Sequence, residues 1–323
     1  MTAPYSARLV CLCLAAFFLV HLAAAAMVRL LAPAFIRMAQ RMRPRLAARF
    51  LLGLRLLPTA LAAFVVAGLC APSYLWLEPA AGSEDVGAAC LAAAALGAVL
   101  WAESLVRGLR AAARSAWYVR ECRKAARQMR CAGQARAVWV VPAKAPFLVL
   151  AGVWRTRLVV SQAVVDALGE EQLAAALRHE RAHQESHDNL KRLVALLAPG
   201  ILPGVRGLAP LERAWARFTE WAADDRAVAG DSRASLSLAE ALVRVARLGG
   251  APPLAPLTTS LMADGRDLAE RVERLLRPAA NPARGVPLAV TGTAAALCAA
   301  AAMSMLNPAV LYSVHGLLEH LTR

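Results

Sequence analysis

The sequence predicts a mainly α membrane protein, in which four transmembrane helices carry a mixed α+β domain inserted between the third and the fourth. Composition supports the membrane part of this prediction, since 59% of the 323 residues are hydrophobic and the mean hydropathy is +0.48. The apolar residues are gathered in long runs, each close to the about 20 residues that a helix needs to cross about 30 Å of hydrocarbon. Short β-branched runs and helical patterns that follow the third apolar run predict the inserted domain.

Four apolar runs predict the transmembrane helices. They cover residues 9–32, 56–77, 86–106 and 288–312. His21 and Arg29 interrupt the first run, and a cleaved signal peptide is its alternative interpretation, because Arg8 precedes it and small residues end it. The expected domains are three transmembrane helices over 1–107, the inserted domain over 108–284, and the fourth transmembrane helix with a short outer tail over 285–323.

Charged residues between the runs predict the topology. The charged residues in the connection between the second and third runs are all acidic. A series of basic residues, from Arg107 to Arg130, follows the third run. The connection between the first two runs is also basic, with Arg37, Arg41, Arg43, Arg45 and Arg49. The positive-inside rule then requires all three runs to span, with the N-terminus outside and the inserted domain in the cytoplasm. Basic residues beside anionic lipid headgroups also account for the net charge of +15, so membrane lipid rather than nucleic acid is the expected partner.

A helical pattern over residues 168–193 carries the motif on which the functional prediction depends. In the segment HERAH, His179 and His183 lie one turn apart on the same helix face, with about 6 Å between their Cβ atoms, so two imidazoles can share one metal ion. Glu180 is displaced around the helix, where it can act as a general base without ligating the ion. The alternative is a solvated polar helix face that binds no metal.

A second helical pattern supplies the third metal ligand. In FTEWAADDRAV, Glu220 and Asp224 are four residues apart, so Glu220 can complete a His-His-Glu zinc site while Asp224 accepts the free ring N–H of a ligand histidine. His187 is the competing ligand, but its Cα would lie about 12 Å along the helix from that of His179. The sequence therefore predicts one zinc ion per chain, bound by His179, His183 and Glu220.

Shorter patterns complete the inserted domain. A basic helix is expected over 108–130, followed by a small sheet of two or three strands within 135–142, 146–152 and 156–161. The apolar segment 193–210 is broken by Pro and Gly, and we expect it to pack at the membrane surface or against other helices. Helices are expected over 235–248 and 267–276. Candidates for a second oxyanion or substrate contact are His187, Arg226 and Arg271.

Taken in order, these segments resemble the membrane gluzincin metallopeptidases, and within them the BlaR/MecR β-lactam sensor antirepressor family. The motif set is HERAH followed by Asp188 and Asn189, then Glu220 and Asp224, and the resemblance covers roughly residues 107–312. It implies a zincin-like catalytic domain on the cytoplasmic side of a bacterial inner membrane. It also implies a zinc endopeptidase whose action on a protein substrate leads to loss of a winged-helix transcriptional repressor and to self-cleavage, as part of signal transduction.

Two departures limit what the resemblance implies. Only SVHGLLEHLTR follows the fourth run, so the extracellular penicillin-binding sensor domain is not expected and β-lactam sensing is not implied. The two alanines before Asp224 are also typical of HtpX-like quality-control proteases, which leaves a housekeeping membrane protease as an alternative. A non-catalytic membrane interaction platform and a zinc hydrolase acting on lipid-like substrates are the alternatives outside the peptidases.

Overall fold

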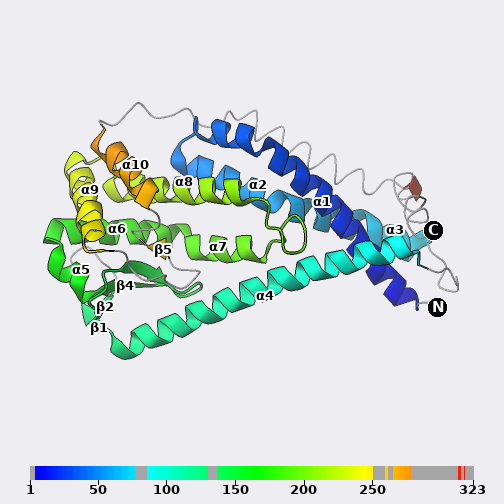
Figure 1. Cartoon of the computed structure of the whole chain (residues 1–323), viewed down its shortest axis with the longest axis horizontal. Helices are drawn as coiled ribbons and strands as arrows, with labels where there is room; N and C mark the ends of the chain where they lie inside the picture. Colours follow the sequence, from blue (N-terminus) through cyan, green and yellow to red (C-terminus); the bar gives the residue numbers. More distant parts are fainter. Residues whose placement is uncertain are drawn as a thin grey trace.

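The computed structural model describes residues 4–77, 86–129, 137–249, 259–260, 265–277, 312–313 and 316. Within these residues the chain is mostly helical, with one small sheet (Figure 1). The sheet and its covering helices lie at one end of the molecule, α1 (Tyr5–Ala39) and α3 (Ala71–Leu77) lie toward the other end, and α4 (Ala88–Ala125) runs along the molecule from α3 to the sheet.

Three long helices correspond to the first three apolar runs. They are α1 (Tyr5–Ala39), α2 (Pro44–Val65), which continues through a π turn (Val66–Cys70) into α3 (Ala71–Leu77), and α4 (Ala88–Ala125). Each is long and apolar enough to cross a membrane, which confirms three of the predicted spans by length and composition. The fourth predicted span, residues 288–312, lies outside the described residues except for its last position. Helix α4 continues without a break through the expected domain boundary at residue 107.

The sheet has five short strands. They are β1 (Arg127–Met129), β2 (Val138–Val141), β3 (Leu148–Ala151), β4 (Arg157–Ser161) and β5 (Thr259–Ser260), in the spatial order β1-β2-β4-β3-β5. Strands β2 and β4 are parallel, and the other neighbours are antiparallel. The three predicted strands are present. The predicted basic helix ends at Ala125 rather than at residue 130, because the chain turns there and pairs with β2 as β1.

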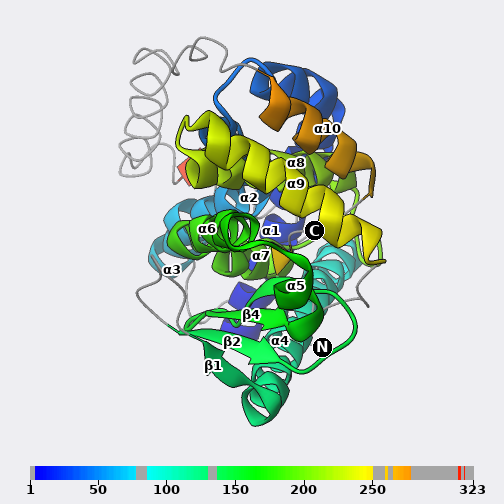
Figure 2. The same cartoon turned by 90° about the vertical axis from the view of Figure 1, so that its left-hand side faces the viewer.

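Helix α6 (Glu170–Ser186) is the centre of the second part of the molecule. It follows the short helix α5 (Gln162–Ala167) and lies between the sheet and two helices, α8 (Ala209–Val228) and α9 (Ser232–Arg247) (Figure 2). Apolar residues from all these layers form one core, including Leu148, Leu150, Leu177, Leu238 and Leu242. Helix α10 (Gly265–Leu276) packs across α9 and α8. His179, Glu180 and His183 of the HERAH motif are therefore enclosed, whereas Arg181 reaches the solvent.

The predicted helix over 168–193 is broken, which corrects the sequence-based expectation. Helix α6 ends at Ser186, His187 adopts a left-handed conformation with φ of 55° and ψ of 39°, and a new helix, α7 (Asp188–Leu197), begins. Asn189 explains the new direction, since its Nδ2 donates to the carbonyls of Leu150 and Gly152 at 2.9 and 2.7 Å and so ties the start of α7 to the end of β3. Within a continuous helix Asn189 would point elsewhere.

Helices α7 and α8 form a hairpin that enters the space between α1, α2 and α4 (Figure 1). Polar residues of the long helices hold its tip, residues 200–207. His21 Nε2 lies 2.7 Å from a carbonyl oxygen of the tip, Arg29 donates to another at 2.7 Å, and Glu103 accepts a tip N–H at 3.0 Å. The segment expected to pack against other helices does so, and the charges that interrupt the apolar runs are its partners.

A shared apolar core joins α8 to the long helices. Trp215 and Phe218 of α8 pack with Val28 of α1 and Leu51 of α2, and all four side chains are buried. Since α8 also carries Glu220, the position of this ligand depends on the packing of the long helices.

Candidate metal centre

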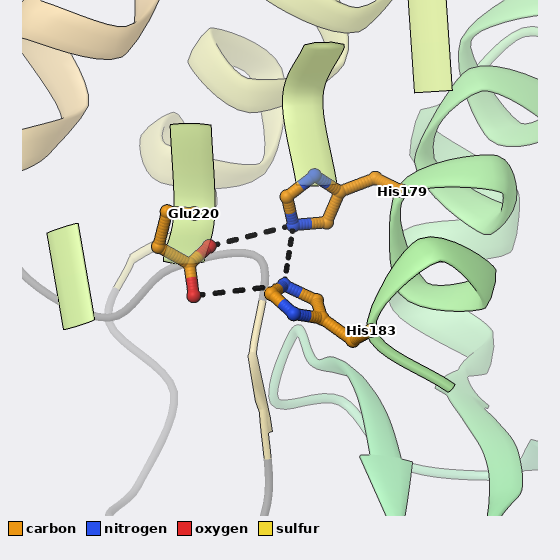
Figure 3. A group of neighbouring side chains, drawn as sticks. All are labelled: His179, His183 and Glu220. Atoms are coloured by element: carbon orange, nitrogen blue, oxygen red, sulfur yellow. Dashed lines mark hydrogen bonds and ion pairs between the residues drawn. The ribbon is translucent and has the colours of Figure 1, made fainter. Parts of the chain in front are cut away.

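Side chains from two helices converge on one point in the interior. His179 and His183 of α6 face Glu220 of α8 (Figure 3). The Nε2 atoms of the two histidines are 3.1 Å apart, and Glu220 Oε2 and Oε1 lie 3.4 and 3.6 Å from Nε2 of His179 and His183, respectively. Four ligands at about 2.0–2.1 Å around a tetrahedral zinc ion are about 3.3 Å from one another. The three donor groups are thus already spaced as ligands of one metal ion.

The state of Glu220 is compatible with a bound cation at this point. Its side chain is 5% exposed, and neither carboxylate oxygen accepts a hydrogen bond from the described residues. A buried carboxylate without hydrogen bonds is costly unless a positive charge compensates it. The arginines near it, Arg271 and Arg192, are 3.3 and 3.8 Å away. These donors can hold a metal ion.

Each candidate histidine ligand has its own carboxylate partner. Asp224 Oδ1 lies 2.9 Å from Nδ1 of His179, and Asp188 Oδ2 lies 2.8 Å from Nδ1 of His183. The contact of Asp188 is a hydrogen bond, which holds the ring proton of His183 on Nδ1 and directs Nε2 toward the ion, whereas the contact of Asp224 with His179 has ion-pair distance without hydrogen-bond geometry. The sequence predicts the role of Asp224, but it misses that of Asp188, because a residue five positions after His183 would point away from it in a continuous helix.

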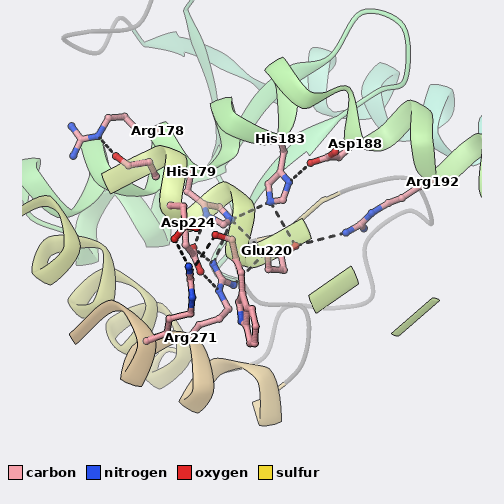
Figure 4. A network of polar contacts seen from close by, with 12 residues as sticks. Arg178, His179, His183, Asp188, Arg192, Glu220, Asp224 and Arg271 are labelled. Atoms are coloured by element: carbon pink, nitrogen blue, oxygen red, sulfur yellow. Dashed lines mark hydrogen bonds and ion pairs between the residues drawn. The ribbon is translucent and has the colours of Figure 1, made fainter. Parts of the chain in front are cut away.

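Arg271 reaches the cluster from α10 (Figure 4). Its Nε and Nη2 donate to the two oxygens of Asp224 at 2.9 and 2.7 Å, and its Nη1 lies 3.3 Å from Glu220 Oε2. The guanidinium is buried and engaged by both carboxylates. Arg271 is therefore a positioning residue for Asp224 and Glu220, rather than the free oxyanion donor that the sequence suggested.

The other two predicted contact residues lie away from the cluster. His187 is exposed at the turn between α6 and α7, and Arg226 is exposed near the end of α8, where it pairs with Glu185 at 3.4 Å. Arg192 of α7, which the sequence analysis did not single out, approaches Glu220 on the side away from Arg271 (Figure 4). Its side chain is 21% exposed, so it borders both the cluster and the solvent.

Glu180 lies inside the same charged group. It is fully buried on α6, one residue after His179. Burial lowers the pKa of His183, but the carboxylates of Glu220, Asp188 and Glu180 outweigh burial and raise that pKa to about 10. Glu180 thus adds negative charge to the surroundings of the candidate ligand His183.

The carboxylates of the cluster are held ionised by their cationic neighbours. Burial raises the pKa of Asp224, but Arg271 and His179 outweigh burial and lower it to about 2. The pKa of Glu220 is likewise far below its usual range, because His183, His179 and Arg271 outweigh the effect of burial. Against the effect of burial, the same carboxylates raise the pKa of both histidines, with Asp224 and Glu220 acting on His179 and Glu220 and Asp188 on His183.

Metal affinity is expected to rise with pH. His183 carries a proton in the metal-free protein up to a pKa of about 10, and this proton must leave when Nε2 binds a metal. Between about pH 6 and pH 8, we expect the apparent zinc affinity to increase about tenfold per pH unit for each proton released. Competition with a chromophoric chelator at several pH values measures the affinity, and calorimetry in buffers of different ionisation enthalpy counts the protons. A flat profile would contradict the assigned protonation.

Asp188 provides a second test of the geometry. Replacing Asp188 with Asn removes the negative charge next to His183 Nδ1 while preserving size, and we expect zinc affinity to fall about 10- to 100-fold. Asp224→Asn is expected to produce a loss of the same order through His179. Asp166→Asn on the exposed face of α5 is the matched control and should bind zinc like the wild type. Unchanged affinity in Asp188→Asn would show that the contact does not orient the ligand.

Comparisons of this chain with protein-family models, with curated proteins and with solved structures found no match.

Proposed function

We propose that this chain is a zinc-dependent endopeptidase of the bacterial inner membrane, with its active site on the cytoplasmic side. The observation that carries the proposal is the triangle of His179, His183 and Glu220 donors, together with the fully buried Glu180, which follows His179 in the same helix. Two histidines and one glutamate form a common catalytic zinc set, which leaves a position open for water or substrate. A structural zinc site does not need a further carboxylate placed as a base.

The residues divide the chemical work among them. When bound, zinc supplies a Lewis acid that activates water and polarises a peptide carbonyl. Glu180 takes the proton from the attacking water and delivers it to the leaving amine. Asp188 keeps His183 in the tautomer that binds through Nε2, and the negative charge of Asp224 beside Nδ1 of His179 favours the same tautomer there. Arg192, which borders Glu220 and the solvent, is our assignment for the donor that stabilises the negative charge on the carbonyl oxygen.

The proposed substrate is a cytoplasmic or membrane protein, cleaved in regulated signalling. The resemblance to the BlaR/MecR family suggests a winged-helix repressor or the chain itself as the target. Three helices long and apolar enough to cross a membrane support an enzyme that acts at the bilayer. An HtpX-like quality-control protease would use the same chemistry, and cleavage of many unfolded membrane proteins would distinguish it from a signalling protease.

Complete burial of the metal ligands favours a second candidate, a structural metal site in a non-catalytic membrane protein. His179 and His183 have no exposed surface, and Arg271 covers Glu220. In this case the metal would stabilise the packing of α6 against α8 without turnover.

One experiment distinguishes the two candidates. The full chain is purified in detergent, its zinc content is measured, and cleavage of casein and of the chain itself is followed before and after chelation. We expect one zinc per chain, cleavage that is lost on chelation and restored by zinc, and loss of both zinc and cleavage in Glu220→Ala. Glu171→Ala, an exposed position on α6, is the control. Zinc binding without any cleavage by the loaded protein would overturn the peptidase proposal.

A further inference from the structure

A second cavity lies close to the metal centre but opens between other elements. It has a volume of about 240 Å³ and is enclosed by the first turns of α2, the turn between α6 and α7, and α8. The charged side chains that line it are Arg45, Arg49, Lys191, Arg226, Glu185 and Asp188. Since a water molecule takes up about 30 Å³ of liquid, the cavity has room for a group of several heavy atoms.

The two acids of the cavity are already neutralised. Asp188 contacts His183 at 2.8 Å and Lys191 at 2.7 Å. Glu185 contacts Arg181 at 3.1 Å and Arg226 at 3.4 Å. The lysine and one arginine of the cavity thus have their counter-charges within the protein.

Arg45 and Arg49 have no such counter-charge among the described residues. In the part of the chain that the structure describes, neither guanidinium forms an ion pair or a hydrogen bond. They are one turn apart at the start of α2, where the first turn contains no acid and the N-cap side chain makes no capping bond. The helix dipole adds further positive potential at this end. The cavity therefore has an excess of positive charge, provided by two arginines that face it together.

The position of the cavity relative to the apolar run of α2 favours a lipid headgroup as the anion that it binds. Arg49 precedes the apolar run that begins at Leu56 by seven residues, or about 10 Å along the helix. With this run placed across the hydrocarbon, as we propose, the two arginines lie at the level of the lipid headgroups. Arginine binds phosphate through paired N–H donors. Leu52 and Trp215 line the same cavity and provide apolar surface next to the cations.

We propose that this cavity binds the phosphate-bearing headgroup of an anionic phospholipid, with Arg45 and Arg49 as the ligands of the phosphate. The site is separate from the proposed peptidase chemistry, since neither arginine contacts His179, His183 or Glu220. The cavity and the candidate metal centre share Asp188, which lines the cavity and also forms a hydrogen bond with His183. The headgroup would fasten the start of α2 and the α6–α7 turn to the same lipid molecule.

The test uses the full chain in neutral detergent and two matched double variants. Arg45→Ala/Arg49→Ala removes the proposed ligands. Arg110→Ala/Arg114→Ala removes an exposed pair with the same spacing on α4 and is the control for general attraction to a basic surface. Binding of phosphatidylglycerol, phosphatidylcholine and inorganic phosphate is measured by native mass spectrometry. Zinc content and thermal unfolding establish that each variant is folded.

We expect the wild type and the α4 variant to retain one phosphatidylglycerol in preference to phosphatidylcholine, and the α2 variant to bind it about 30-fold more weakly. An equal loss of phosphatidylglycerol binding in both variants would show that the lipid is attracted by basic surfaces in general, and this result would overturn the site. Unchanged binding in the α2 variant would also overturn it. Displacement of phosphatidylglycerol by inorganic phosphate at the same concentration would assign the cavity to a soluble phosphate and overturn the lipid assignment.

Discussion

Replacing Glu180 with Gln is expected to lower the rate of peptide cleavage by about 10²- to 10⁴-fold while the protein keeps one zinc per chain. Gln has the size of Glu, so the packing of the fully buried side chain within α6 is preserved. The amide cannot accept the proton of the attacking water, which removes the general base. The metal donors are other residues, His179, His183 and Glu220, so zinc remains bound.

Two further variants make this result specific. Glu220→Gln is expected to lose zinc as well as activity, because it replaces a candidate ligand. Glu171→Gln, on the exposed first turn of α6, should match the wild type in both measurements. Zinc content by atomic absorption and cleavage under single-turnover conditions separate binding from chemistry. Cleavage at the wild-type rate by zinc-loaded Glu180→Gln would remove the proposed mechanism.

Replacing Arg55 with Ala is expected to destabilise the protein by about 3–5 kcal/mol. Arg55 of α2 is 5% exposed and donates to Glu212 at 2.7 Å and to carbonyl oxygens of residues 195–199 at 3.0, 3.1 and 3.3 Å. These carbonyl groups lie at the C-terminal end of α7, so the positive charge of Arg55 also compensates the negative end of the dipole of that helix. Because Glu212 is 31% exposed, the loss comes mainly from the buried carbonyls that are left without a donor.

The same substitution is expected to weaken the metal centre. The carbonyl groups that Arg55 contacts lie where α7 ends and the connection to α8 begins. Helix α8 carries Glu220, so a shift of this connection would move Glu220. Unfolding in mixed detergent micelles measures stability, and zinc content reports on the site. Arg55→Lys should lie between the wild type and Arg55→Ala, since one ammonium cannot reach all four acceptors, and the exposed Arg110→Ala on α4 should change stability by less than about 0.5 kcal/mol. A similarly small effect of Arg55→Ala would disprove this role.

Sequence patterns were sufficient for features that depend on local spacing. Apolar length alone predicts the three helices that are long and apolar enough to cross a membrane, since hydrocarbon thickness sets the length that such a helix needs. The i, i+4 spacing on one helix places His179 beside His183, and the same spacing places Glu220 and Asp224 on one face of another helix. The sequence by itself therefore determined the long apolar helices and the residues that could together hold a metal ion.

Only the tertiary structure decided how these parts are joined. The left-handed His187 breaks the helix and brings Asp188 back to His183, because Asn189 bonds to the end of β3, which is distant in sequence. Arg271 reaches Asp224 across 47 positions of the chain, and Arg55 reaches Ala195 across 140. Such contacts have no periodic signature, since their free energy depends on which buried groups meet after folding and not on the neighbours of either residue along the chain.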